Sequence, residues 1–105
     1  MDKKAEEPVI FDVQKITSIA DYFLICHGNS DRQVKAIAEN IIEQFKNIGI
    51  NSFAREGFEG SNWIVIDYSD LLVHVFRKEE RRYYNLEGLW GQSPKVKIRG
   101  SRKKA

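Results

Sequence analysis

The residue types that most often carry catalysis or bind metals are scarce in this sequence, which has one cysteine, Cys26, and two histidines, His27 and His74. Structural zinc sites need four such ligands at short spacings, and the two histidines are far apart in the chain. Cys26 lies in an apolar run, which predicts a buried and unreactive thiol. His74 alternates with apolar residues, which predicts a packed or interface histidine. These residues predict neither a metal site nor a catalytic centre.

Two short motifs could still do chemistry. Asp67 and Asp70 could form an acid pair for a metal, but they lie three residues apart on an expected loop, where Asp favours turns. Gly28-Asn29-Ser30 opens an expected helix, where backbone N–H groups could bind an anion. This motif lacks the lysine of a P-loop and the spaced glycines of a dinucleotide site, so a turn and a helix cap explain it better. We therefore expect no cofactor and no enzymatic activity.

A basic and aromatic cluster near residue 80 offers a different chemistry. Basic side chains beside aromatic rings can bind single-stranded nucleic acid through charge and stacking. Acidic residues are interspersed with the bases, which favours an ordinary mixed helix surface. The cluster comprises Arg77, Lys78, Arg81, Arg82, Tyr83 and Tyr84, with Glu79, Glu80 and Glu87 among them.

The two aspartates and His74 belong to the stretch 63–76, which predicts a β-hairpin. Two apolar, β-rich runs, 63–66 and 71–76, are separated by four residues that favour turns. We expect Ile66 to pair with Leu71. Because side chains alternate between the faces of a strand, one face carries a conventional core and the other is nearly as apolar. The first face holds Ile64, Ile66, Leu71, Val73 and Val75, and the second holds Trp63, Val65, Leu72, His74 and Phe76.

The remaining elements predict an α/β fold. A helix over 30–48 has a capping box at Ser30 and Gln33 and one apolar stripe, and it forms the kind of crossover that parallel neighbours need. We expect a mixed β-sheet of about five strands with flanking helices, in a two-layer or three-layer sandwich. The further expected elements are strands over 8–13, 22–27 and 50–55 and a helix over 79–90.

The second face of the hairpin needs a cover. Helix 30–48 should cover one face of the sheet, and the helix over 79–90 is too short to cover all of the other. Trp63 and Phe76, with their neighbours, would then expose on the order of several hundred Å² of apolar surface. Apolar patches of this size are typical of interaction sites. The pattern therefore predicts a protein–protein interface.

Composition indicates a single cytoplasmic domain with a basic tail. The chain has 105 residues, a net charge of +2, and no run long enough for a membrane helix or a signal peptide. We expect one domain over 1–91 and a disordered tail over 92–105. Without the tail the body holds more acids than bases, which suits a basic partner. The bases of the tail are Lys95, Lys97, Arg99, Arg102, Lys103 and Lys104.

A set of motifs runs in order through roughly residues 8–91. The segments are Asp12-Val13, Ser18 to Phe23, Gly28-Asn29-Ser30, Arg32 to Ala38, Trp63 to Tyr68, Asp70, Val73 to Phe76, Arg82, and Tyr84 to Trp90. In residue type, order and spacing these segments resemble the ribosomal silencing factor family (RsfS/Iojap), and the length of the motifs makes the resemblance specific.

The resemblance implies a translation repressor whose fold is nucleotidyltransferase-like. Family members bind ribosomal protein uL-fourteen on the large ribosomal subunit and hinder association with the small subunit. Carried over to this chain, the contact surface includes Trp63, Tyr68, Leu72, His74 and Phe76, with Asp67 and Asp70 pairing with basic residues of that protein.

Three alternatives stay open at this point. A nucleotidyltransferase-like enzyme is the main rival function. A homodimer could use the face that carries Trp63 on a second copy of the chain. The basic tail could contact the rRNA backbone through its charge.

Overall fold

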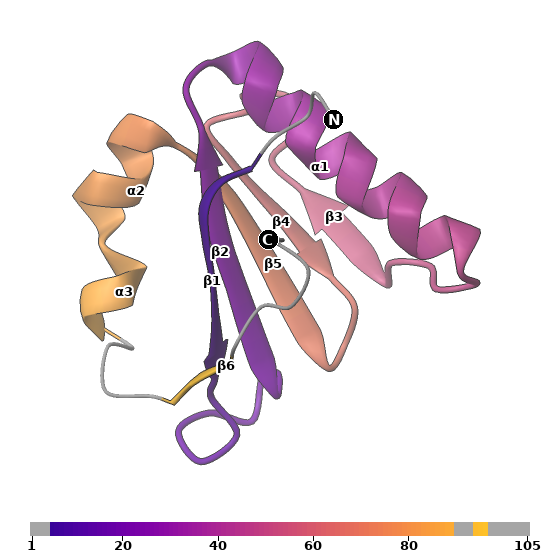
Figure 1. The fold of residues 1–105 in the computed structure, drawn as a ribbon, viewed down its shortest axis with the longest axis vertical. Helices are drawn as coiled ribbons and strands as arrows, with labels where there is room; N and C mark the ends of the chain where they lie inside the picture. The colour runs from indigo at the N-terminus through magenta and orange to yellow at the C-terminus, as the bar shows by residue number, and fades with distance from the viewer. Residues whose placement is uncertain (1–4, 90–93, 97–105) are drawn as a thin grey trace, which may run out of the picture.

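The computed structural model describes residues 5–89 and 94–96 and has three layers. A six-stranded sheet forms the middle layer, in the order β3-β4-β5-β2-β1-β6. Figure 1 shows helix α1 on one face of the sheet and helices α2 and α3 on the other. The elements are β1 (Glu6–Asp12), β2 (Tyr22–Gly28), α1 (Asp31–Asn47), β3 (Ala54–Glu56), β4 (Trp63–Asp67), β5 (Leu71–Arg77), α2 (Lys78–Tyr84), α3 (Leu86–Leu89) and β6 (Lys95–Val96).

The predicted α/β class with a mixed sheet is confirmed, with one strand more than expected. Strand β6 pairs antiparallel with β1, and the Asp12 N–H donates to the Pro94 carbonyl at 2.8 Å. The domain boundary predicted at residue 91 therefore lies before the last strand. No helix among the described residues is long and apolar enough to cross a membrane.

The central pair of strands, β2 and β5, is parallel, and every other pairing is antiparallel. Helix α1 leaves β2 and returns the chain to β3 at the far edge of the sheet, so the strands that it joins are not neighbours. The parallel neighbour of β2 is instead β5, which the chain reaches through the β4–β5 hairpin. This arrangement places the hairpin next to the most buried strand.

The β4–β5 hairpin forms as predicted but with a register two residues away from the expected one. Ile66 pairs with Val73, and Trp63 pairs with Phe76. The reason is that Asp67 continues the strand, and the loop then closes where the Tyr68 N–H donates to the Leu71 carbonyl at 2.9 Å. A shift of two residues keeps each side chain on its face, so the predicted faces are correct.

Helix α1 covers the first face of the hairpin. Its N-cap Ser30 accepts from the Gln33 N–H at 3.1 Å, and the Gln33 side chain accepts from the Asn29 N–H at 2.8 Å, so the predicted capping pair forms. The buried cluster between helix and sheet comprises Cys26, Val34, Ile37, Ala38, Ile64, Ile66, Val73 and Val75.

The second face is covered more completely than expected. The single helix predicted over 79–90 divides at Asn85, whose φ of 49° is left-handed, into α2 and α3. This break lets the two short helices follow the sheet. A second buried cluster lies beneath them and comprises Phe11, Val13, Ala20, Phe23, Ile25 and Phe76, with Leu86 of α3 packed against it. The last helical segment leaves Trp63, Val65 and Leu72 partly exposed, as expected, whereas Phe76 is fully buried.

Candidate interaction surface

Part of the second face, over β4 and β5, stays half-exposed beside α2. We call this part the Trp63 surface, defined by Trp63, Val65 and Asp67 of β4, Leu72 of β5, and Tyr84 of α2. A shallow pocket of about 150 Å³ opens at its edge, lined by Ala54, Arg55, Glu56, Val65, Asp67 and Leu72. The edge strand β3 thus supplies charged groups next to an apolar centre.

Trp63 is held in place from three sides. Its ring centroid lies 4.9 Å from that of Phe76 and 4.8 Å from that of Tyr84. Its Nε1–H donates to His74 Nδ1 at 3.1 Å. A side chain fixed by rings and a hydrogen bond loses little conformational freedom when a partner covers it, which favours binding.

His74 is the polar group beneath this surface. Trp63 Nε1–H can only donate, so His74 Nδ1 is the acceptor and the neutral ring carries its proton on Nε2. Nε2 is buried and has no hydrogen-bond partner within the described residues. Burial lowers the pKa of His74 to about 4, so the ring is neutral at pH 7. Its role here is to orient Trp63.

The structure divides the seven residues predicted to contact a partner. Trp63, Asp67 and Leu72 lie half-exposed on the second face. Phe76 has no exposed surface and His74 is 6% exposed, because α2, α3 and Trp63 cover them. Contact of these two side chains with a partner stays a prediction, and in this structure they support Trp63 from below.

Tyr68 and Asp70 are separate from the Trp63 surface. The Tyr68 ring packs edge-on against Phe45 of α1 at 4.6 Å, on the first face of the sheet. Asp70 is exposed in the loop between β4 and β5. Asp67 Oδ1 accepts from the Ser69 N–H at 2.7 Å, which is the turn role that the sequence predicts. No group of three or more His, Cys, Asp or Glu residues that could hold a metal occurs within residues 5–89 and 94–96.

Cys26 behaves as predicted. Its side chain has no exposed surface, and burial raises the pKa of the thiol to about 12. The group is therefore protonated at neutral pH and is a poor nucleophile.

Of the predicted tail contacts, only Lys95 falls in the described part of the chain, where it is exposed on β6. The others lie outside the described residues: Lys97, Arg99, Arg102, Lys103 and Lys104.

Two members of the surface were not among the predicted contacts. Val65 lies on the predicted second face, and its alternation with Trp63 was the signal. Tyr84 comes from α2, and its sequence signals were its place in the basic and aromatic cluster and in the last segment of the family resemblance. Its position beside Trp63 depends on tertiary packing, which the local pattern does not encode.

Comparison with known proteins identifies the same family as the motifs in the sequence. The family model described as "Ribosomal silencing factor during starvation" (RsfS) matches residues 1–105. Ribosomal silencing factor RsfS of Bacillus subtilis is 53% identical over 93 residues, which cover 89% of this chain and 79% of that protein.

Two solved structures agree with the fold. A crystal structure of a Bacillus halodurans protein is 47% identical, with a TM-score of 0.79 over 92% of this chain and 88% of the other. An X-ray structure of a Chromobacterium violaceum protein is 32% identical, with a TM-score of 0.82 over 99% of this chain and 88% of the other. The resemblance found in the sequence is therefore confirmed, and the chain belongs to the ribosomal silencing factor (RsfS) family.

Proposed function

We propose that this protein represses translation by binding ribosomal protein uL-fourteen on the large ribosomal subunit through the Trp63 surface. The observation that carries the proposal is Trp63, an aromatic side chain that is fixed by its neighbours but only half-buried, on a partly apolar surface. Relatives bear the name ribosomal silencing factor, which supports a ribosomal target. Anchors of this kind, with pre-set geometry, dominate the energy of many interfaces.

The charges around the patch suit a basic partner. Asp67 and Glu56 lie at the pocket beside one base, Arg55, and Asp70 is exposed at the end of the same hairpin. A ribosomal protein carries basic side chains that can pair with these carboxylates and speed encounter. The basic tail, which includes Lys95, can add contact with the rRNA backbone.

Silencing by this route requires no chemistry. A protein that covers about 1,600 Å² of surface, the size of an ordinary specific interface, blocks a second large body from the same place. Occupancy of the face that the small subunit docks against is then sufficient to hinder subunit association. Within the described residues, no acidic cluster suited to a metal supports the rival nucleotidyltransferase-like activity.

Co-sedimentation with isolated large and small subunits tests the proposal. We expect binding to the large subunit alone. Trp63→Ala should weaken it by on the order of 2 kcal/mol, or roughly 30-fold, because it removes the aromatic anchor. Undiminished co-sedimentation of this variant would show that the contact lies elsewhere.

A second variant separates binding from folding, since Trp63 also packs on Phe76. Glu56 has an exposed side chain at the edge of the Trp63 surface, so Glu56→Lys should leave the fold intact while placing a like charge against a basic partner. The matched control is Glu39→Lys on α1, an exposed residue on the other side of the sheet. Equal losses for the two charge reversals would indicate a nonspecific effect of net charge. Sizing chromatography of the free protein reports whether the chain forms a homodimer, and a return to monomer in Trp63→Ala would place the dimer contact on this surface.

A further inference from the structure

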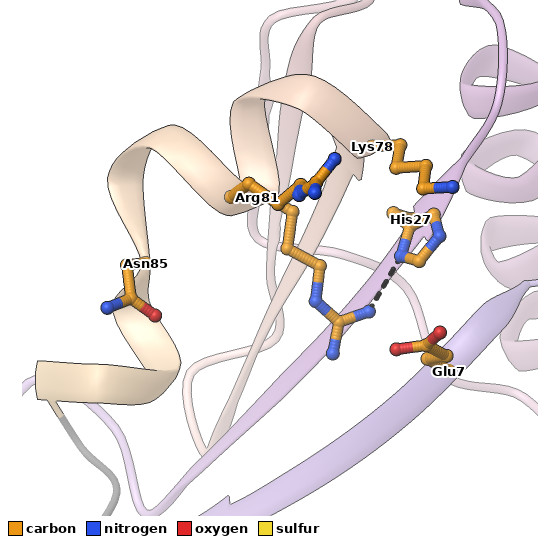
Figure 2. Close-up of a pocket in the computed structure, with 6 residues that line it drawn as sticks. Glu7, His27, Lys78, Arg81 and Asn85 are labelled. Carbon is orange, nitrogen blue, oxygen red and sulfur yellow. Dashed lines mark hydrogen bonds between the residues drawn. The ribbon is translucent and has the colours of Figure 1, made fainter.

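A second recess shares no residue with the Trp63 surface and lies on the other side of α2. It has a volume of about 390 Å³ and is lined by Glu7, His27, Lys78, Arg81, Arg82 and Asn85. Figure 2 shows Lys78 and Arg81 on α2, His27 near the end of β2 and Glu7 on β1, with the Arg81 guanidinium directed at the His27 ring. We call this recess the His27 pocket.

The lining of the His27 pocket is strongly basic. Lys78, Arg81 and Arg82 stand at positions i, i+3 and i+4 of α2, so the helix presents all three toward one side. Glu7 is the one acidic residue among the lining side chains. The local charge therefore favours an anion over a metal cation.

Arg81 and His27 form the base of the pocket. Arg81 is 6% exposed, His27 is 5% exposed, and Arg81 Nη1 lies 2.9 Å from His27 Nδ1. Arg81 Nη1–H also donates to the Glu6 carbonyl at 3.3 Å, which ties α2 to β1. A guanidinium carries only donors, so His27 Nδ1 must accept, and the neutral ring keeps its proton on Nε2. The imidazole is thereby fixed as a donor at its other nitrogen.

Two lining cations remain at the mouth of the pocket. Lys78 and Arg82 are exposed on α2, next to the buried base. Both side chains are long and can close over a ligand that enters from solvent. The pocket therefore combines a fixed donor site with two adaptable charges, an arrangement that suits a compact anion with several acceptor oxygens.

Glu7 sets an opposing charge at the same place. It lies at an irregularity in the pairing of β1 with β2, between Glu6 and Val9, and its φ of 46° is left-handed. Such irregularities re-aim side chains, and Figure 2 shows the Glu7 carboxylate beneath His27 and Lys78. An anion in the pocket would meet repulsion from this group, so Glu7 provides a test with the opposite sign.

We propose that the His27 pocket binds a phosphate group, held by Lys78, Arg82 and the His27 Nε2–H over a base organised by Arg81. A phosphate matches three cations and a neutral donor better than a carboxylate does, because it carries more charge and more acceptor oxygens. The phosphate can belong to an RNA backbone or to a free phosphate compound. This inference is independent of the contact proposed for the Trp63 surface.

Calorimetric titration at fixed ionic strength tests the proposal with two probes, inorganic pyrophosphate and a short single-stranded RNA. We expect saturable binding of at least one. RNA alone would identify a backbone phosphate as the ligand, and pyrophosphate alone would identify a free phosphate compound. Absence of saturable binding with both probes would overturn the proposal.

The variants locate the site. K78Q/R82Q should weaken binding by at least about tenfold, because it removes two charged donors. The control K35Q/K46Q removes the same charge from exposed positions of α1 and should change binding less than about twofold. Glu7→Gln should tighten binding. Equal weakening by the two double variants, or a loss of affinity in Glu7→Gln, would overturn the assignment to this pocket.

Discussion

The two histidines, His27 and His74, lie on the same face of the sheet, in the neighbouring parallel strands β2 and β5. They also make the same kind of hydrogen bond. Each accepts a hydrogen bond at Nδ1 from a side chain that can only donate, His27 from Arg81 and His74 from Trp63. Their remaining surroundings differ completely. Aromatic rings enclose His74, whereas basic side chains and a recess border His27.

The contrast shows how one residue type serves two purposes in one small domain. The pKa of His74 is lowered by burial alone, so its neutral ring acts as a rigid acceptor under Trp63. The pKa of His27 is also lowered, mainly by burial and to a smaller extent by the charge of Arg81. The negative charges of Glu7 and Glu6 offset part of this decrease. One histidine therefore belongs to a packed apolar support and the other to an electrostatic site.

Phe76 lies between the surroundings of His27 and those of His74. Its replacement should have the largest effect on stability of the changes proposed here. It pairs with His27 across the parallel strands and lies 6.1 Å from the His74 ring, with no exposed surface. Phe76→Ala should lower the free energy of unfolding by about 3–5 kcal/mol because it leaves a cavity between them. Urea denaturation measures this loss.

The control for Phe76 is an aromatic residue outside the buried core. Tyr83 is 82% exposed on α2, and Tyr83→Ala should change the unfolding free energy by less than about 0.5 kcal/mol. If Phe76→Ala prevents folding altogether, Phe76→Leu provides a smaller loss of the same sign. Comparable values for the Phe76 and Tyr83 variants would contradict the buried position of Phe76.

The pH dependence of the unfolding free energy should show the next largest effect, and it reports on His74. His74 has a folded pKa of about 4 against 6.5 for an unperturbed histidine, so the unfolded chain binds the proton more readily. The stabilisation is complete above pH 6.5 and is lost as the pH falls toward 4, by up to about 3 kcal/mol. Urea denaturation at pH 7 and at pH 4 measures the loss.

Comparison with His74→Gln isolates the histidine from the carboxylates, which titrate in the same acidic range. The variant should lose less stability between the two pH values than the parent chain. Identical losses would mean that His74 is protonated as easily in the folded protein as in the unfolded one. The lowered pKa of His27 acts in the same direction and is present in both chains.

The sequence predicted the parts of this fold that depend on local periodicity. The apolar stripe of α1, its Ser30 cap and the two faces of the β4–β5 hairpin all follow from spacing alone. The predicted register of the hairpin was wrong because Asp67, a residue type that favours turns, is the last residue of β4. The division of the last helix was missed, although Asn is one of the residue types that most readily adopts the left-handed conformation found at Asn85.

The candidate site residues that follow from local periodicity were predicted, whereas those placed by packing between distant segments were not. Trp63 and Leu72 stand out because an apolar second face on a hairpin is unusual, and alternation identifies it. The coverage of Phe76 and the placement of Tyr68 on the α1 side depend on packing between distant segments. The His27 pocket depends on it still more, since Arg81 reaches the Glu6 carbonyl across 75 positions of the chain.

The smallest expected effect separates the two histidines most directly. The charge of Arg81 lowers the pKa of His27 and does not act on His74, so Arg81→Gln should raise the pKa of His27 toward its ordinary value and leave that of His74 in place. Arg82→Gln is the matched control, because Arg82 lines the same pocket but is not among the charges that shift His27. NMR titration of the imidazole C–H protons resolves both rings in each variant. Parallel movement of the two pKa values in Arg81→Gln would mean that the variant has loosened the whole face, and the electrostatic distinction between the histidines would then fail.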